Sequence, residues 1–384
     1  MTAGARRMLV FALSSANFVV GMGAFVVIGV LTPVAEDFAL TEAEAGLMMT
    51  AYALAYAVGS PTLVALSGGM ARRTVLATGL SIFTAAVTLT AIAPTPDILF
   101  AARVMTGIGA GLITPVAAGV AAAASPPEGR GKALAAAFFG LTLAQVLGVP
   151  VGAWLGYTYG WETVFCLNAA LGAAALTAIL MLVPRDIPFQ VNSLGTLREA
   201  LGDLRTVLAI LFTVLSMAAV YVFYTYTAPV LEARMGFDRD GVSLFLLAFG
   251  VGAVFGNLLG GWLTDRIGAY RTLIFVASTG IVFLSVYSFL PIPAWLLYAQ
   301  AVFWAVCGWS FAASQQFRLI SMAPERQNVM LALNAAAIYV GVSLGSWIGG
   351  VTLRIAGLDA LGLTGAAVSA LALLTLVLSE RLRP

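Results

Sequence analysis

The sequence predicts an all-α membrane protein with twelve transmembrane helices in two six-helix bundles. The first observation is composition: of 384 residues, 61% are hydrophobic and only 9% are charged. Soluble domains carry about 25% charged residues, so a water-soluble globule is not expected. The second is that nearly all charges fall in short gaps between long apolar runs, and the third is that the two halves of the chain repeat each other.

Each apolar segment is close to the ~20 residues that cross a bilayer as an α-helix. The twelve segments lie near residues 8–33, 45–67, 74–94, 98–124, 133–157, 163–184, 207–231, 242–264, 272–292, 294–317, 329–353 and 360–379. The first follows two arginines, as the core of a secretion signal would. It continues to Pro33, however, and so exceeds the roughly 7–15 apolar residues of such a core. We therefore expect it to be the first spanning helix.

The basic residues predict the orientation of the chain. Fifteen of them fall on one side: Arg6, Arg7, Arg72, Arg73, Arg130, Lys132, Arg185, Arg198, Arg205, Arg266, Arg271, Arg318, Arg326, Arg381 and Arg383. Only Arg234, Arg239 and Arg354 fall on the other side. Because Lys and Arg concentrate in cytoplasmic loops, we expect both termini to be cytoplasmic, in a multi-pass protein of the bacterial inner membrane.

From the second predicted helix to the end of the eleventh, the sequence aligns with itself without a gap when it is shifted by 197 residues. Glycines matched by this shift include the pairs Gly59 and Gly256, Gly111 and Gly308, Gly148 and Gly345, and Gly152 and Gly349. Six helices, a polar loop and six more helices indicate parallel repeats related by an axis along the membrane normal. We expect an N-terminal bundle at 1–184, a cytoplasmic linker at 185–206 and a C-terminal bundle at 207–384.

This architecture predicts a solute carrier. Paired repeat bundles enclose a site near the bilayer midplane and rock about it, opening it to one side at a time. A channel would need a selectivity filter, and no filter-like sequence is present. The predicted spans hold no nucleophile–base pair or paired carboxylate, which argues against an enzyme. With no His, and only Cys166 and Cys307 in different halves, we expect no metal, cofactor or disulfide.

Three stretches carry a resemblance to a known family. They are YALAYAVGSPTLVALSGGMARRTVL (52–76), RVMTGIGAGLITP (103–115) and GLTLAQVLGVPVGAWLGYTYGW (140–161). The whole chain resembles the major facilitator superfamily, specifically its twelve-helix drug and metabolite efflux branch of the arabinose-efflux and purine-efflux permease type. The resemblance implies the major facilitator fold and a monomer that exports a small molecule, in many relatives against protons, with no nucleic-acid partner.

The first motif of the family reads G-x-x-x-D-R-x-G-R-R and joins helices 2 and 3. Arg72 and Arg73 match its basic pair, but two glycines stand where the acid belongs. The second half keeps the acid in GGWLTDRIG, as Asp265 followed by Arg266. By resemblance these residues latch one conformation, and the missing acid weakens the latch of the first half. The alternative is that they are solvated loop charges that only set the topology.

Arg103 is the only charged residue that the sequence places away from loops and membrane edges. A charge at the bilayer centre costs about 3 kcal/mol or more, so such residues usually face a water-filled cavity. In the same motif, Gly107 and Gly111 belong to a glycine stripe on which another helix can pack. We expect Arg103 to contact substrate or to take part in coupling. The alternative is that it lies near the outer membrane edge, close to Asp97, and snorkels to water.

The third motif places Gly148, Pro150 and Gly152 on helix 5, with Gly345 and Gly349 as repeat partners on helix 11. A proline bend beside small residues lets helices pivot and pack closely. We expect these residues to be scaffold and hinge positions without chemistry of their own.

Polar and aromatic residues inside the spans are the remaining candidates for the cavity lining. By resemblance, helices 1, 4, 7 and 10 line the path. The candidates are Asn17, Tyr221, Tyr224, Trp304, Trp309 and Asn334, and Gln315 ranks lower because it lies near the cytoplasmic end. For each of them an interhelical hydrogen bond or an interfacial aromatic is an equal alternative.

The chain lacks the acidic residue that efflux permeases of this branch often carry in helix 1, where it has GMGAF at 21–25. No Asp, Glu or His falls within a predicted span, and an arginine does not titrate near neutral pH. Three routes stay open: coupling through Glu36 or Asp37 at the mouth, a proton carried by the substrate, or export down a gradient. We predict export of a small neutral or anionic organic molecule. The alternative is uptake, or facilitative uniport, of a sugar- or nucleoside-like solute.

Overall fold

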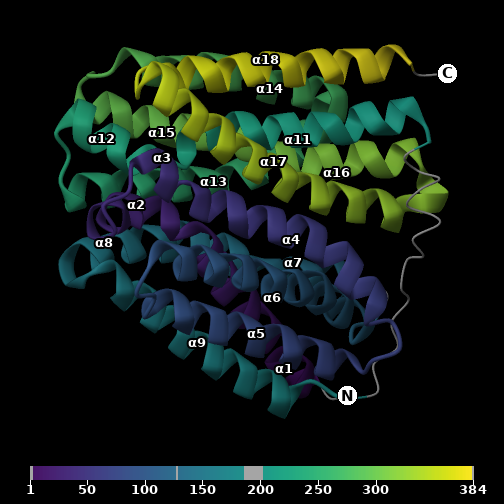
Figure 1. The fold of residues 1–384 in the computed structure, drawn as a ribbon. Coiled ribbons are helices and arrows are strands. Elements are labelled where there is room, and N and C mark those ends of the chain that lie inside the picture. Colours follow the sequence, from purple (N-terminus) through teal and green to yellow (C-terminus); the bar gives the residue numbers. More distant parts are fainter. Residues whose placement is uncertain (1–2, 127–128, 186–201, 383–384) are drawn as a thin grey trace. The chain divides into compact units, whose positions relative to one another are not determined.

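The structure is a computed structural model that describes residues 3–126, 129–185 and 202–382. Every regular element in these ranges is helical, and twelve stretches are long and apolar enough to cross a membrane, as predicted. The chain forms two compact units, within each of which the long helices run side by side (Figure 1). Most of the expected linker, residues 186–201, lies outside the described residues.

The first unit comprises Met1–Pro33 and Ala51–Val191. The elements of the first half of the sequence are α1 (Ala3–Phe25), α2 (Val27–Asp37), α3 (Glu42–Ala45), α4 (Leu47–Leu66), α5 (Arg72–Ala91), α6 (Pro96–Ala123), α7 (Arg130–Leu143), α8 (Val149–Tyr159) and α9 (Trp161–Leu182).

The second unit comprises Asn192–Pro384 together with Val34–Thr50 from the first half of the sequence. Its further elements are α11 (Leu204–Tyr224), α12 (Thr227–Met235), α13 (Arg239–Ile267), α14 (Ala269–Val286), α15 (Ala294–Trp309), α16 (Phe311–Met322), α17 (Gln327–Ala356) and α18 (Ala360–Arg381). The segment 34–50 packs on this unit because the Tyr226 ring fills the space beside Gly46, and because the Ser343 hydroxyl donates to the Thr50 carbonyl at 3.1 Å.

Two spans predicted as single helices are broken. In the first span α1 ends at Phe25 and α2 starts at Val27, with Val30 in a non-helical conformation. Pro33 contributes to this irregularity because it has no N–H to donate to the carbonyl four residues earlier. In the seventh span the break between α11 and α12 is fixed by Ser346 of α17. Its side chain bonds Thr225 Oγ1 at 2.7 Å, and its carbonyl accepts from the Tyr226 hydroxyl at 2.8 Å.

The fifth span is irregular just before Pro150. Residues Ala144–Gly148 form a π-helical turn between α7 and α8. Pro150 cannot donate to the Val146 carbonyl, and a π turn is one way for a helix to absorb such a lost bond. The irregularity therefore lies one turn before the proline that the third motif singled out.

Several helices are longer than predicted, and their terminal turns carry charges that the sequence analysis assigned to gaps. Asp97, Glu162 and Asp240 lie in the first turns of α6, α9 and α13, while Arg266 and Arg381 lie in the last turns of α13 and α18. The helix dipole explains this extension, because it favours acidic side chains at helix starts and basic side chains at helix ends.

The glycines of the third motif and of its repeat bring helix 5 onto helix 1 and helix 11 onto helix 7. A Cβ at Gly152 would collide with the Val26 side chain, and a Cβ at Gly349 would collide with the Val222 carbonyl. At Gly345 it would meet the Ala218 backbone, whereas at Gly148 it would meet only the Met22 side chain, at an ordinary 3.6 Å. The two repeats therefore use glycine differently at this matched pair.

Helices 2 and 4 of each repeat also approach closely, but the glycines lie on opposite partners. In the first unit Gly107 and Gly111 of α6 face the backbone of Tyr52 and Ser60 on α4. In the second unit the glycines lie on α13, including Gly252, Gly256 and Gly260, and face the backbone of α15 and of the turn that follows it. The corresponding helix pair is therefore closely packed in both units, but the glycines that permit it lie on the fourth helix of the first repeat and on the second helix of the second repeat.

Candidate functional site

Arg103 lies on α6 in the interior of the first unit, with an exposed fraction of 0%. Its Nη1 donates to the Gly23 carbonyl of α1 at 2.8 Å, and its guanidinium carbon lies 4.8 Å from the centre of the Tyr52 ring on α4. The second contact is within cation–π range. Its Nε and Nη2 are buried and have no hydrogen-bond partner among the described residues. This burial and the contacts with α1 and α4 favour an interior position for Arg103 over one in which it snorkels to water.

The helix segments around Arg103 are held by polar and backbone contacts. With its amide oxygen turned towards Gly23, Asn168 of α9 accepts from the Gly23 N–H at 3.1 Å and donates to the Val19 carbonyl at 3.2 Å. Gly107, one turn after Arg103, rests on the carbonyl of Tyr52. The arginine therefore lies between an α1 backbone fixed by α9 and an α4 backbone that contacts α6 directly. The sequence analysis missed Asn168, although it is a lone amide in an apolar span.

Asn17 forms an interhelical bond. Its Nδ2 donates to the Ala137 carbonyl of α7 at 2.9 Å, and the side chain is fully buried. Its Oδ1 has no hydrogen-bond partner among the described residues. The contact matches the structural alternative for this residue and ties helix 1 to helix 5.

Asn334 belongs to a buried amide and hydroxyl network in the second unit. Thr213 of α11 donates to Asn334 Oδ1 of α17 at 2.8 Å. Gln315 Nε2 of α16 donates to Thr213 Oγ1 at 3.0 Å and to the Ala209 carbonyl at 2.8 Å. Gln315, ranked low in the sequence analysis, is fully buried and links α16 to α11, and the network continues through Thr213 to α17. Its position about two turns before the end of α16 did not place it in water, because the helix turns that face inward.

The aromatic candidates of the second unit pack against one another. Trp304 of α15 is 2% exposed, and its ring centre lies 4.9 Å from that of Phe249, 5.3 Å from that of Tyr287 and 6.1 Å from that of Tyr224. Tyr221 meets Tyr224 edge-on at 5.8 Å. Such pairs add about 0.5–1.5 kcal/mol beyond burial, which makes this cluster part of the unit's core. Trp309 lies apart from it, half-buried at the end of α15.

The latch residues differ between the two repeats. Arg72 is buried at the start of α5, where its Nη2 donates to the Gly68 carbonyl at 2.7 Å, and Arg73 beside it is half-buried. Asp265 and Arg266 are exposed at the end of α13, and the Arg266 guanidinium lies 5.5 Å from the Trp262 ring centre. Asp265 has no ion-pair partner among the described residues. The latch role of Asp265 therefore stays a prediction.

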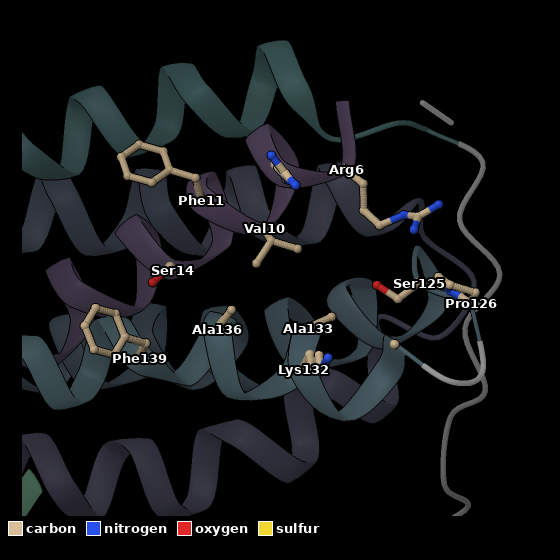
Figure 2. Close-up of a pocket in the computed structure, with 12 residues that line it drawn as sticks. Arg6, Val10, Phe11, Ser14, Ser125, Pro126, Lys132, Ala133, Ala136 and Phe139 are labelled. Atoms are coloured by element: carbon tan, nitrogen blue, oxygen red, sulfur yellow. The ribbon is translucent and has the colours of Figure 1, made fainter. Parts of the chain in front are cut away.

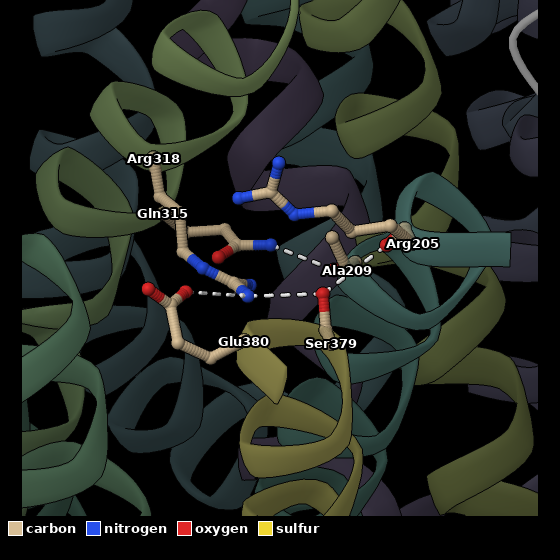
Figure 3. Close-up of polar contacts among 6 residues, drawn as sticks. All are labelled: Arg205, Ala209, Gln315, Arg318, Ser379 and Glu380. Atoms are coloured by element: carbon tan, nitrogen blue, oxygen red, sulfur yellow. Dashed lines mark hydrogen bonds and ion pairs between the residues drawn. The ribbon is translucent and has the colours of Figure 1, made fainter. Parts of the chain in front are cut away.

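Besides Arg72, Arg318 of α16 is a further buried cation at 5% exposed, so the expectation that Arg103 is alone is wrong (Figure 3). Its Nη2 donates to Ser379 Oγ at 3.0 Å and lies 3.6 Å from Glu380 Oε2 on α18. The Ser379 hydroxyl donates to the Arg205 carbonyl of α11 at 3.1 Å. A sequence signal for this burial exists. The inward positions of α16 fall at 311, 314, 315, 318 and 319, the spacing of one helix face.

The fold and these buried polar residues define a membrane transporter. A family model described as the Major Facilitator Superfamily matches residues 13–322, and the chain therefore belongs to that superfamily. Its twelve apolar helices and its bacterial relatives make it a multi-pass protein of the bacterial inner membrane.

Among its relatives, the inner membrane transport protein YdhP of Escherichia coli (strain K12) is 31% identical over 97% of this chain and 96% of its own length. The uncharacterized MFS-type transporter YbcL of Bacillus subtilis (strain 168) is 28% identical over 93% and 92%. A bacterial homologue of the human lysosomal transporter Spinster, in an inward-facing and occupied conformation, has a similar fold, with a TM-score of 0.82 at 16% identity over 99% and 98% of the two chains. The D-xylose–proton symporter gives 0.78 at 17% identity over 98% of each chain.

Proposed function

We propose that this transporter exports a small neutral or anionic organic molecule by alternating access, and that Arg103 contacts the substrate. The observation that carries the proposal is the unsatisfied guanidinium: one of its nitrogens reaches the Gly23 carbonyl, while Nε and Nη2 have no partner among the described residues. A buried donor without a partner costs about 1–3 kcal/mol, and more when charged. A carboxylate, phosphate or carbonyl oxygen of a substrate would satisfy these donors.

The charge of Arg103 sets the substrate class. An organic cation would meet a buried positive charge with no carboxylate bonded to it among the described residues. Repulsion in a low-dielectric interior makes such binding unfavourable. A neutral molecule with carbonyl or hydroxyl groups, or an organic anion, fits better.

Efflux is the proposed direction because the three motifs match the efflux branch. The competing direction is uptake, or facilitative uniport, of a sugar- or nucleoside-like solute. Solved structures with a similar fold include the D-xylose–proton symporter and a mutant of the nucleoside transporter NupG, which has a TM-score of 0.80 at 14% identity. Identities this low support the fold and do not choose between the directions.

In the proposed orientation both termini lie in the cytoplasm. The proposed transporter acts as a monomer. Cysteine labelling tests the orientation: a cysteine at position 192 should be reached only after the cells are permeabilised. Labelling of that position from outside intact cells would contradict it.

Transport in inverted and right-side-out vesicles tests the function. A panel of purines, sugars, organic acids and cationic drugs would be assayed with the wild type, Arg103→Ala, Arg103→Lys and the exposed-residue control Arg271→Ala. We expect accumulation of a neutral or anionic compound inside inverted vesicles, loss in Arg103→Ala, partial recovery in Arg103→Lys because Lys lacks the planar fork, and no change in the control. A permanently cationic dye as the best substrate, or full activity of Arg103→Ala, would refute the proposal.

A further inference from the structure

A groove of about 490 Å³ lies in the first unit between the start of α1 and the start of α7 (Figure 2). It is separate from the Arg103 site. Its walls come from the first turns of α1, the end of the segment after α6 and the first turns of α7. Phe11 and Phe139, on facing helices, are 72% and 57% exposed, so the groove is accessible from the surface of the unit.

One end of the groove is cationic. Arg6, Arg7 and Lys132 line it, and none of the lining residues that the structure describes is acidic. Ser125 lies at the same end and is 7% exposed, and its hydroxyl has no hydrogen-bond partner among the described residues. A buried hydroxyl beside three cations is a donor set suited to a phosphate oxyanion.

The rest of the groove is apolar. Val10, Phe11, Ala136 and Phe139 continue from the cationic end along both helices. From Arg7 to Ser14 the helix rises about 10 Å, the reach of several acyl carbons. A free phosphate or a small soluble anion would use the cationic end and leave this wall exposed. A phosphate ester that carries hydrocarbon would cover both.

We propose that this groove binds an anionic phospholipid, with the phosphate at Arg6, Arg7, Lys132 and Ser125 and one acyl chain along Phe11 and Phe139. Basic residues concentrate at this end of the spans, and basic pockets between transmembrane helices at the cytoplasmic leaflet recognise anionic headgroups. The proposal does not depend on the substrate or on the direction of transport.

The test is lipid retention by the purified full-length protein in neutral detergent, read by native mass spectrometry with phosphatidylglycerol and phosphatidylcholine. The triple variant Arg6→Gln, Arg7→Gln and Lys132→Gln should lower phosphatidylglycerol affinity by at least about tenfold, because each basic residue strengthens attraction to an anionic lipid. A charge-matched control, Arg130→Gln with Arg266→Gln and Arg271→Gln, changes three exposed residues that do not line the groove and should retain the lipid. Equal retention of both lipids, or an unaffected triple variant, would overturn the proposal.

Further arms separate a lipid from a free anion and guard against misfolding. Inorganic phosphate and glycerol phosphate at millimolar concentration should not displace the lipid, and Phe139→Ser should weaken lipid binding although all three cations remain. Displacement by either soluble anion would instead assign the groove to a free oxyanion. If the triple variant does not fold, Lys132→Gln and Ser125→Ala alone should each reduce retention, and unchanged retention in both would reject the site.

Discussion

At the scale of single residues, two of the three buried arginines, Arg103 and Arg318, each have two guanidinium nitrogens without a hydrogen-bond partner among the described residues, and they differ in whether a carboxylate lies beside them. Arg318 has a serine hydroxyl and a carboxylate within 3.6 Å, whereas Arg103 has one backbone carbonyl and an aromatic face. A buried charge without a counter-charge is destabilising, and a protein retains it only for another reason. Arg318 therefore fits a role in holding helices together, and Arg103 fits a role in binding.

Replacing Arg103 by methionine should separate stability from transport. Because the guanidinium leaves two donors unsatisfied, Arg103→Met should leave the melting temperature in detergent unchanged or raise it. Transport should fall by about 100-fold or more, the equivalent of nearly 3 kcal/mol of lost interaction. Melting followed by tryptophan fluorescence, together with transport by the same preparation, measures both. A fall in stability that matches the loss of transport would mean that Arg103 is structural.

Two ion pairs of the second unit provide a second comparison. Glu380 pairs with buried Arg318 and is 23% exposed, whereas Asp359 pairs with Arg234 at a site where both side chains are at least 40% exposed. Glu380→Gln should cost about 1–3 kcal/mol, because the Arg318 charge stays buried with a weaker partner. Asp359→Asn should cost less than about 1 kcal/mol, as exposed pairs do, although its contact is the shorter one. Thermal unfolding in detergent compares them, and a larger loss for Asp359→Asn would contradict the argument from burial.

At the scale of helices, close backbone approach fixes which glycines are required. Gly260 and Gly261 are neighbours on α13, but a Cβ at Gly260 would lie 2.7 Å from the Ser310 backbone, while a Cβ at Gly261 would meet nothing within 4 Å. The sequence does not distinguish the two glycines. The structure predicts that only Gly260 is sensitive to an added side chain, because only Gly260 faces the turn between α15 and α16.

Gly260→Ala should destabilise the second unit by about 1–3 kcal/mol through overpacking against backbone that cannot move aside. Gly261→Ala should be neutral, or should stabilise by up to about 1 kcal/mol, because alanine is the better helix former. Expression level and melting temperature of the two variants, each with the same added methyl group, provide the measurement. Similar losses in both would show that the contact between α13 and this turn is not as described.

The start of α11 is a capped helix end whose strength depends on pH. Asp203 accepts from the Thr206 hydroxyl at 2.7 Å and from the backbone N–H groups of Thr206 and Arg205, and these bonds, the hydroxyl first, lower the pKa of its carboxyl. A lowered pKa in the folded state means that the cap stabilises the helix above the ordinary aspartate range, and that this stability is lost as pH falls through the lowered value.

Asp203→Ala should cost about 1 kcal/mol at neutral pH, seen as faster hydrogen exchange in the first turn of α11. Asp203→Asn should keep most of the cap and remove its pH dependence. Exchange compared across the acid range in the wild type and both variants tests this expectation. An identical acid response in Asp203→Asn would assign the effect to other carboxyls.

At the scale of the whole molecule, the sequence predicts the spans well because hydropathy and the 197-residue repeat act over long stretches. It does not predict the breaks at Val26 and at Thr225, which depend on contacts with a neighbouring helix such as the Ser346 bonds. For the same reason the sequence identifies Arg103 as a charge within a span, but it predicts neither the Gly23 carbonyl as its partner nor the burial of Arg318. The role of a single residue depends on which face of its helix points inward. In a span that is apolar on all sides, the sequence pattern indicates that face only weakly.

Energy coupling is a property of the whole transporter, and the described residues bear on whether protons can be coupled through the mouth carboxylates. Glu36 and Asp37, the mouth carboxylates considered for coupling, are both exposed at the end of α2. Among the described residues, Arg103 contacts a backbone carbonyl and a tyrosine ring and pairs with no carboxylate, whereas Arg318 in the second unit lies beside Glu380. No carboxylate among the described residues therefore lies beside Arg103 to receive a proton from Glu36 or Asp37.

An imposed pH gradient should therefore change transport little in proteoliposomes, except through ionisation of the substrate itself. The assay would follow a non-ionising substrate with the gradient in each direction and with none, and Arg103→Met would serve as the inactive control. Equal initial rates, with accumulation that stops at the external concentration, are expected for a carrier driven by the substrate gradient. Uphill accumulation of a non-ionising substrate would contradict this, and the loss of that accumulation in Glu36→Gln or Asp37→Asn would then identify the coupling carboxylate.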